Sequence, residues 1–326
     1  MIIMNRNTSP IEALSNDAIA KVAERTLISQ YPEEELARFK ALYAEQSGLP
    51  QGQIELANGS DEWLQKLMIQ FGAGGVLALD PDFFMYEEYA QQIGRQMHYV
   101  TSDQDYNFDT SDILVAIEDI RPSLFILSNP HNPTGYQFPA ADLQQMADAM
   151  EAVAGYFVID EAYIEFGEDY QRPTNPNVII VRTLSKMYAM AGLRIGIAYA
   201  QGTTFDRLTA INHPYPVNNI SLNLANALFE DPERLKELVA YQKASRERLV
   251  AIFQGLTDVM KVKDTQSNFV FTYGGRAKEL GEYLVTKGFL PRMYSQENLA
   301  NVVRYSIIRL EDYDALEAAI NEWRNA

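Results

Sequence analysis

The chain contains no cysteine among its 326 residues, which excludes disulfide bonds, thiol catalysis and cysteine-ligated zinc. Histidine is nearly as scarce, with three residues at positions 98, 131 and 213 that are far apart in the sequence. This scatter disfavours a histidine metal site and a Ser-His-Asp triad, and no serine lies in a Gly-x-Ser-x-Gly turn. We therefore expect no metal and look for chemistry that rests on other side chains.

Basic residues are also few: 27 lysines and arginines face 44 aspartates and glutamates, for a net charge of −17. This balance argues against nucleic acid or an anionic membrane as a partner, although a few arginines can still form a local anion site. No apolar run is long enough to cross a bilayer, and the run at residues 1–4 is too short for a signal peptide. We expect a soluble, cytoplasmic protein that acts on small molecules.

Helical and strand patterns alternate between residues 31 and about 200. Short apolar runs at 76–80, 124–127, 156–159 and 178–181 indicate buried strands, and 140–153 has helical character. The alternation predicts an α/β fold with a mainly parallel sheet covered by helices on both faces. Beyond about 215 a long charged helix (232–253), two short strands (268–271 and 302–308) and a final helix (313–323) follow. We expect a large domain at 31–215 and a small α+β domain at 216–326. An N-terminal arm at 1–30 should pack with the small domain or with a partner subunit.

The most informative segment is Leu184-Ser185-Lys186-Met187, with Arg194 eight positions after the lysine. It follows the apolar run at 178–181, so Lys186 should lie just beyond the carboxyl end of a buried strand. Partial desolvation there would make its amine available for imine formation. Thr183, Ser185 and Arg194 would suit a phosphate. Pyridoxal 5'-phosphate (PLP) is a cofactor that needs both an imine-forming lysine and a phosphate site.

Two further polar segments follow predicted strands. Asn132 lies in Asn129-Pro130-His131-Asn132-Pro133-Thr134-Gly135, which indicates a rigid turn and could hold one amide towards a ligand. Asp160 follows the run 156–159, where it could cap the next helix or keep the pyridine nitrogen of PLP protonated.

Ser60 and Asp61 come between Gly59 and a helical run at 63–71, and they predict a helix N-cap. The free N–H groups of a first helical turn also bind phosphate, so capping and phosphate binding can coexist.

These residues resemble the fold-type I PLP-dependent enzymes, specifically aminotransferases of class I and II. The segments Asn-Pro-His-Asn-Pro-Thr-Gly, Asp-Glu-Ala-Tyr-Ile-Glu-Phe and Thr-Leu-Ser-Lys, with Ala-Gly-Leu-Arg-Ile-Gly, are most similar to histidinol-phosphate aminotransferases. The resemblance implies the PLP-dependent transferase fold. It also implies a homodimer with shared active sites.

The resemblance also implies roles for residues at matching positions. Lys186 would bind the cofactor covalently and move the substrate's proton, Asp160 would pair with the pyridine nitrogen, and Tyr163 with Asn132 would bond the ring's phenolic oxygen. Phe83 stands where the family usually stacks a tyrosine on the ring. Remaining expected cofactor contacts are with the phosphate: Ser60, Asp61, Thr183, Ser185, Arg194, and Tyr31 from the partner subunit.

The resemblance further implies substrate-binding residues near the C-terminus. Arg304 aligns with the arginine that binds a substrate carboxylate, a task suited to the guanidinium fork; the alternative is a surface arginine in an ion pair. Arg292 is a second candidate for an anionic substrate group. The N-terminal arm departs from the family, because Asn5-Arg6-Asn7-Thr8-Ser9-Pro10 lacks the usual glycine and aromatic residue.

The sequence thus predicts a PLP-dependent aminotransferase, similar to histidinol-phosphate aminotransferases, that moves an amino group from a donor to an oxo acid such as 2-oxoglutarate by a ping-pong mechanism. A PLP-dependent lyase of the threonine-phosphate decarboxylase type is an alternative. A non-catalytic PLP-binding regulatory module is another, disfavoured because no basic DNA-binding segment is present.

Overall fold

The computed structural model describes residues 1–325. Seven strands form the larger sheet, in the order β2-β8-β7-β6-β5-β3-β4. Their bounds, in that order, are Ile54–Asn58, Ile195–Ala200, Val178–Thr183, Tyr156–Asp160, Leu124–Ser128, Val76–Asp80 and Met97–Thr101. Only β8 runs against its neighbours, so the sheet is mainly parallel, as the sequence predicts.

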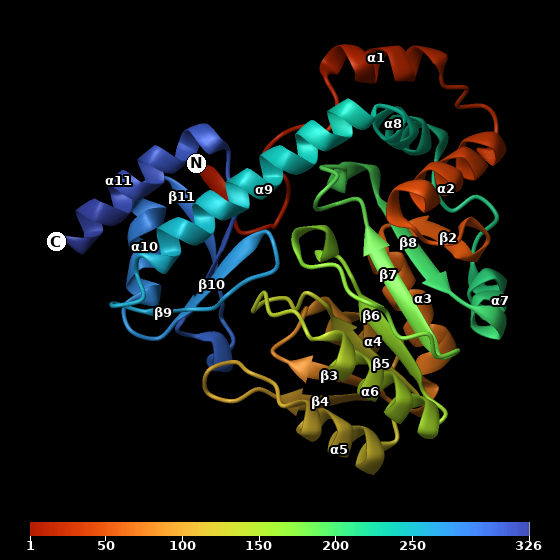
Figure 1. Cartoon of the computed structure of the whole chain (residues 1–326), viewed down its shortest axis with the longest axis horizontal. Coiled ribbons are helices and arrows are strands. Elements are labelled where there is room, and N and C mark those ends of the chain that lie inside the picture. Colours follow the sequence, from red (N-terminus) through yellow and green to blue (C-terminus); the bar gives the residue numbers. More distant parts are fainter. Residues whose placement is uncertain (326) are drawn as a thin grey trace.

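Helices cover both faces of this sheet (Figure 1). One face packs against α3 (Ser60–Phe71), α4 (Met85–Gln92) and α7 (Gly202–Ile211), and the other against α5 (Thr110–Ile120) and α6 (Ala140–Ala152). Successive residues of β6 alternate between the two cores: Val158 joins the first, and Phe157 and Ile159 the second. Strands buried on both faces explain the continuous apolar runs in the sequence.

A smaller sheet has the order β1-β11-β12-β10-β9. Its strands are Ile2–Met4, Phe289–Met293, Val302–Ser306, Phe269–Tyr273 and Lys261–Val262, and α10 (Ala277–Thr286) and α11 (Tyr313–Arg324) complete this part. The N-terminal strand β1 pairs in parallel with β11, so the two ends of the chain meet in one sheet.

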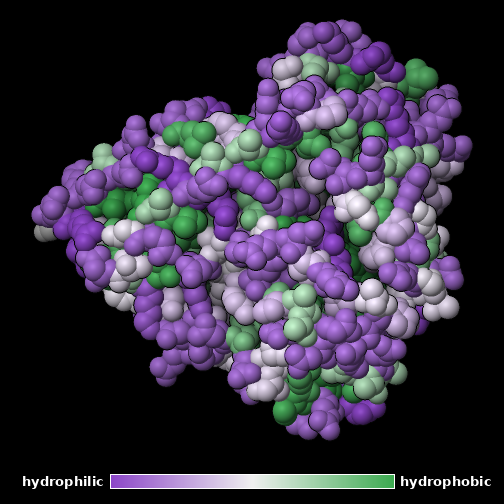
Figure 2. Space-filling view, viewed as in Figure 1, coloured by the Kyte–Doolittle hydropathy of each residue, from purple (hydrophilic) through white to green (hydrophobic). Residues whose placement is uncertain are grey.

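The remaining helices connect the two parts. The long α9 (Pro232–Gln254) runs from one to the other (Figure 1). The helices α1 (Asn16–Arg25) and α2 (Glu33–Ser47) pack against α8 (Asn219–Phe229). The sequence-based boundary at 215/216 therefore separates α8 from α1 and α2, although α8 contacts both of them as well as α9. Figure 2 shows a mainly hydrophilic surface with scattered hydrophobic patches. None of the helices described in residues 1–325 is long and apolar enough to span a bilayer.

Candidate active site

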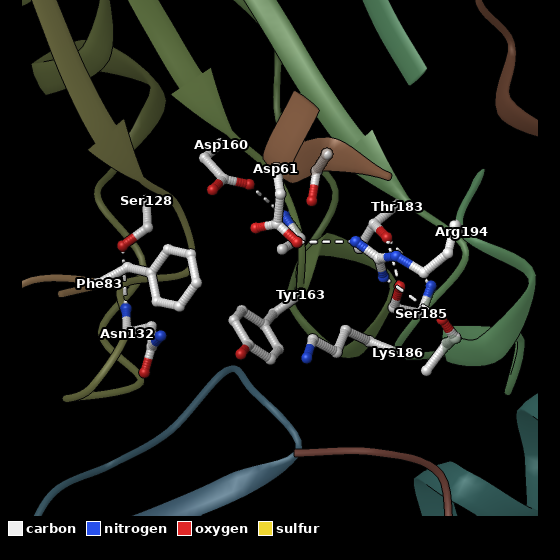
Figure 3. A pocket seen from close by; sticks show the side chains of 13 residues that line it. Asp61, Phe83, Ser128, Asn132, Asp160, Tyr163, Thr183, Ser185, Lys186 and Arg194 are labelled. Carbon is white, nitrogen blue, oxygen red and sulfur yellow. Dashed lines mark hydrogen bonds and ion pairs between the residues drawn. The ribbon is translucent and has the colours of Figure 1, made fainter. Parts of the chain in front are cut away.

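A pocket opens at the carboxyl ends of β5, β6 and β7, the edge where parallel sheets usually bind ligands. The residues predicted for the cofactor line it together: Ser60, Asp61, Phe83, Asn132, Asp160, Tyr163, Thr183, Ser185, Lys186 and Arg194. In Figure 3, Phe83 and Asn132 lie on one side of the pocket and Thr183, Ser185 and Arg194 on the other. Lys186 and Tyr163 lie between these groups.

Lys186 follows β7 in a short turn and is half-buried. Its Nζ lies 5.7 Å from the centre of the Tyr163 ring. Within residues 1–325 this amine has no hydrogen-bond or ion-pair partner. A lysine held in a pocket without a carboxylate partner is placed to react with an electrophile.

Asp160 ends β6 and is 4% exposed. Burial raises the pKa of its carboxyl group to about 6, and hydrogen bonds from the Tyr86 hydroxyl (2.9 Å) and the Ala162 N–H (3.1 Å) oppose this rise. The segment that follows is a single short 3-10 turn, Ile164–Phe166, so Asp160 does not cap an α-helix. A buried carboxylate of this kind is stabilised when a cation such as a protonated ring nitrogen binds beside it.

The first turn of α3 forms one wall of the pocket. The prediction that Ser60 and Asp61 cap this helix is wrong, because the helix begins at Ser60 and Gly59 is the capping residue, with φ of 83°. A Cβ on Gly59 would lie 2.2 Å from Nη2 of Arg194. A Cβ on Gly196 in β8 would lie 2.3 Å from the backbone nitrogen of Ser60. Two glycines thus allow the helix start, the strand and the guanidinium to converge on a site for an anion.

Hydroxyl groups and an ion pair complete this site. The Thr183 hydroxyl donates to Ser185 Oγ at 2.8 Å and accepts the N–H of Ser185 at 3.1 Å. Arg194 pairs with Asp61 at 2.7 Å, and both side chains are 40% exposed. Asp61 therefore positions Arg194 with its carboxylate, and only its backbone N–H is suited to a phosphate.

Phe83 and Asn132 are joined by two residues that the sequence analysis missed, Asp82 and Ser128. The carboxylate of Asp82 accepts the Phe83 N–H (2.7 Å) and the Ser128 hydroxyl (2.8 Å) through the same oxygen. Ser128 Oγ in turn accepts the Asn132 N–H at 3.0 Å. Ser128 is the polar last residue of an apolar strand, paired in register with Asp160, and this position could have identified it.

A second cavity adjoins the first and is lined by Arg6, Arg292 and Arg304 as well as by Phe83, Asn132 and Lys186. Arg304 is 8% exposed, which excludes the surface alternative, and its guanidinium donates to Asn132 Oδ1 at 2.5 Å. Arg292 and Arg304 are direct cross-strand neighbours on β11 and β12. Like charges in this arrangement destabilise a sheet, so the pair indicates an anion site.

Tyr31 lies outside both cavities of this chain. Its side chain is 72% exposed and stacks on Tyr215, with ring centres 4.4 Å apart. The expected contact with a partner subunit's phosphate stays a prediction.

Tyr86 and Asn7 are two further residues of the site that the sequence alone did not reveal. Tyr86 stands three residues after Phe83, in the first turn of α4, and its ring meets the Phe83 ring edge-on with centres 5.5 Å apart. Asn7 is buried and donates to the Tyr163 hydroxyl at 2.9 Å. No local signal marks Asn7, because its contacts depend on residues more than 150 positions away.

Comparison with known proteins agrees with this geometry. The model of the aminotransferase class I and II family matches residues 5–318. The chain belongs to this family. It is accordingly a PLP-dependent aminotransferase with the fold-type I architecture.

Individual proteins similar to this chain belong to the same family. The chain is similar to a histidinol-phosphate aminotransferase of Thermoanaerobacter sp. (strain X514), with 31% identity over 98% of this chain and 92% of the relative. It is also similar to the crystal structure of histidinol-phosphate aminotransferase from Sinorhizobium meliloti in complex with pyridoxal-5'-phosphate. There the TM-score is 0.85 at 25% identity, covering 98% of this chain and 90% of the other. L-threonine-O-3-phosphate decarboxylase from Porphyromonas gingivalis shares the fold, with a TM-score of 0.78 at 20% identity over the full length of both chains.

The residues present fit the family's cofactor. The pocket offers an amine that has no partner among residues 1–325, a buried carboxyl group with an elevated pKa and an anion site at a helix start. These match the aldehyde, ring nitrogen and phosphate of PLP in chemical type.

Proposed function

We propose that the chain is a histidinol-phosphate aminotransferase-like enzyme that moves an amino group from an amino donor to an oxo acid such as 2-oxoglutarate by a ping-pong mechanism. The observation that carries the proposal is the position of Lys186. Its amine, without a partner in the described chain, lies in a pocket shared by Asp160 and the anion site at the start of α3.

When bound, PLP supplies an electrophilic aldehyde and an electron-withdrawing ring. Asp160 would keep the ring nitrogen protonated, and Phe83 would stack on the ring. Ser60, Thr183, Ser185 and Arg194, with the Asp61 N–H, would hold the phosphate, joined by Tyr31 of the partner subunit in a homodimer. Asn132 and Tyr163 would bond the phenolic oxygen.

The Lys186 amine would act as the base that removes the proton from the donor's Cα, and it would return that proton on the cofactor's side. Its placement within one pocket makes the transfer intramolecular, which is the main advantage of a positioned acid–base group. In the second half-reaction the same amine would move the proton in the opposite direction.

Arg304 would bind the substrate's α-carboxylate with its guanidinium fork, beside the Asn132 amide that it already contacts. Arg292 would bind a second anionic group. The net charge of −17 makes this local group of arginines the feature that draws anions to the pocket.

The proposal is tested by the absorption spectrum of the protein with bound PLP, titrated with single amino acids and with histidinol phosphate. We expect a visible band that one amine bleaches and an oxo acid restores. An amine product accompanied by released carbon dioxide would instead identify a lyase. A band that no amine changes would support a regulatory module, and a wild-type protein without a band would overturn the cofactor assignment.

A further inference from the structure

The N-terminal arm enters the active site through one buried residue, Asn7. This side chain is 2% exposed, and its backbone has φ of 55°, in the left-handed region that asparagine tolerates better than most residues. The arm residues around it leave β1 and run beside β12, where the arm's Asn5 carbonyl accepts Arg304 Nη2 at 3.3 Å.

The hydrogen bonds of Asn7 determine which way its amide faces. Its backbone N–H donates to Ser306 Oγ at 3.0 Å, and the Ser306 hydroxyl donates to Asn7 Oδ1 at 2.6 Å. The Asn7 carbonyl accepts Asn268 Nδ2 at 3.0 Å. With the single Ser306 proton donated to Oδ1, Nδ2 is the amide atom left to face Tyr163.

This arrangement determines the direction of the Tyr163 hydroxyl. An amide nitrogen can only donate, so the Tyr163 oxygen must accept from Asn7 Nδ2, at 2.9 Å. The hydroxyl proton is then directed to another acceptor. The Tyr163 ring itself is held edge-on by Phe269, with ring centres 5.3 Å apart.

We propose that Asn7 is a positioning residue that directs the Tyr163 hydroxyl proton towards the phenolic oxygen of the cofactor. The inference rests on the proposed role of Tyr163 and assigns a function to an arm that lacks the family's glycine and aromatic residue. It also links the two ends of the pocket, because the same arm contacts Tyr163 and Arg304. The titratable and charged groups around Tyr163 are Lys186, Tyr86, Tyr294 and, along the pocket wall, Asp160 and Arg304.

The test is a pH titration of the absorption band of the PLP-loaded protein. A hydrogen bond donated to the phenolic oxygen stabilises its charged form, so losing that bond should raise the apparent pKa of the band. Asn7→Gly removes the amide and keeps the positive φ without strain. Asn7→Asp keeps the side-chain shape but turns the donor into an acceptor, which would draw the Tyr163 proton away from the cofactor.

We expect the apparent pKa to rise by about half a unit in Asn7→Gly and by about one unit in Asn7→Asp. Thr8→Ala, on the same arm but without a side-chain hydrogen bond in the described structure, should leave it unchanged. Asn7→Asp carries the test alone if Asn7→Gly does not fold.

A Tyr163→Phe background separates this role from a merely structural one. If Asn7 acts through the hydroxyl, Asn7→Gly shifts the band in the wild-type background and not in Tyr163→Phe. An unchanged apparent pKa in both Asn7 variants, or an equal shift in both backgrounds, would overturn the inference while leaving the cofactor assignment intact. Absence of the band from the wild type would overturn both.

Discussion

The cofactor side and the substrate side of the pocket are assembled from different parts of the chain. Asn132, Asp160 and Lys186 follow three adjacent strands, β5, β6 and β7, and lie within 55 residues of one another. Arg6, Arg292 and Arg304 of the substrate side come from the two ends of the chain and meet only through the small sheet. The cofactor side lies at successive strand ends and is specified by local sequence. The substrate side forms only when the small sheet has folded.

On the cofactor side, the largest effect is expected at Lys186. Lys186→Ala should lower transamination by at least about a thousandfold, because a positioned acid–base group contributes on that scale. The circular dichroism spectrum should be unchanged, since Lys186 makes no side-chain bond in the described fold. Retained transamination would contradict the assignment.

Asp160→Asn should weaken PLP binding by about 10- to 100-fold, since a hydrogen bond to a charged group contributes about 1.5–3 kcal/mol. Burial raises the folded-state pKa of Asp160 from 3.8 to about 6. The carboxylate that pairs with the ring nitrogen is therefore lost as pH falls through 6, and PLP affinity of the wild type should fall with it.

The same raised pKa has the opposite effect on the protein without cofactor. The protonated form is favoured in the fold, so this contribution to stability is full below about pH 4 and is lost as pH rises through 6. Asp160→Asn should remove the loss of PLP affinity at low pH and should reduce the pH dependence of thermal unfolding between about pH 4 and 7, measured by PLP titration and thermal unfolding. The buried Glu165, whose pKa burial raises to about 7, keeps its own contribution to the pH dependence of unfolding. If the variant keeps the wild-type pH dependence, another group is responsible.

Substitutions of Arg304 and Arg292 should differ in their effect on KM, because Arg304 is the more buried of the two. Arg304→Gln should raise KM for the carboxylate substrate about tenfold or more, because a charge-assisted bidentate contact is lost from a buried site. Arg292→Gln should raise KM less. It should also stabilise the protein without substrate by about 0.2–1 kcal/mol, because it relieves the cross-strand repulsion. Equal effects of both variants on KM and no gain in stability would contradict this division.

Phe83 should show the smallest effect. Phe83→Tyr keeps a stacking ring and should change PLP affinity by less than about threefold, whereas Phe83→Leu should weaken it by up to about tenfold through loss of an aromatic contact. Fluorescence titration of the two variants measures the difference. A large loss in Phe83→Tyr would indicate that the hydroxyl is excluded from this position.

The strands that the sequence predicted are those with continuous apolar runs, β3, β5, β6 and β7, together with β10 and β12 of the small sheet. Buried parallel strands leave that signal, while the edge strand β4 is partly exposed and the apolar run of β2 is interrupted by Glu55. The reversal of β8 has no local signature, because strand direction depends on the connection. The pairing of β1 with β11 joins three-residue and five-residue strands across almost the whole chain, so no local pattern could predict it.

The residues of the candidate site also fall into two groups, those with a local signal in the sequence and those without one. Lys186, Asp160, Asn132 and Arg194 could be named because each stands in a motif at a strand end or beside one. Asp82, Ser128 and Asn7 could not, because their significance lies in hydrogen bonds to distant residues. The start of α3 was misplaced by one residue, since Gly59 caps the helix through its positive φ and not through a side chain.

The proposed function depends above all on a covalent bond between Lys186 and the cofactor. It is tested most directly by reducing the PLP-loaded protein with borohydride, digesting it and locating the added mass by peptide sequencing in a mass spectrometer. We expect a single label on Lys186 and none in Lys186→Ala. A label on another lysine, or no label on a protein that binds PLP, would contradict it.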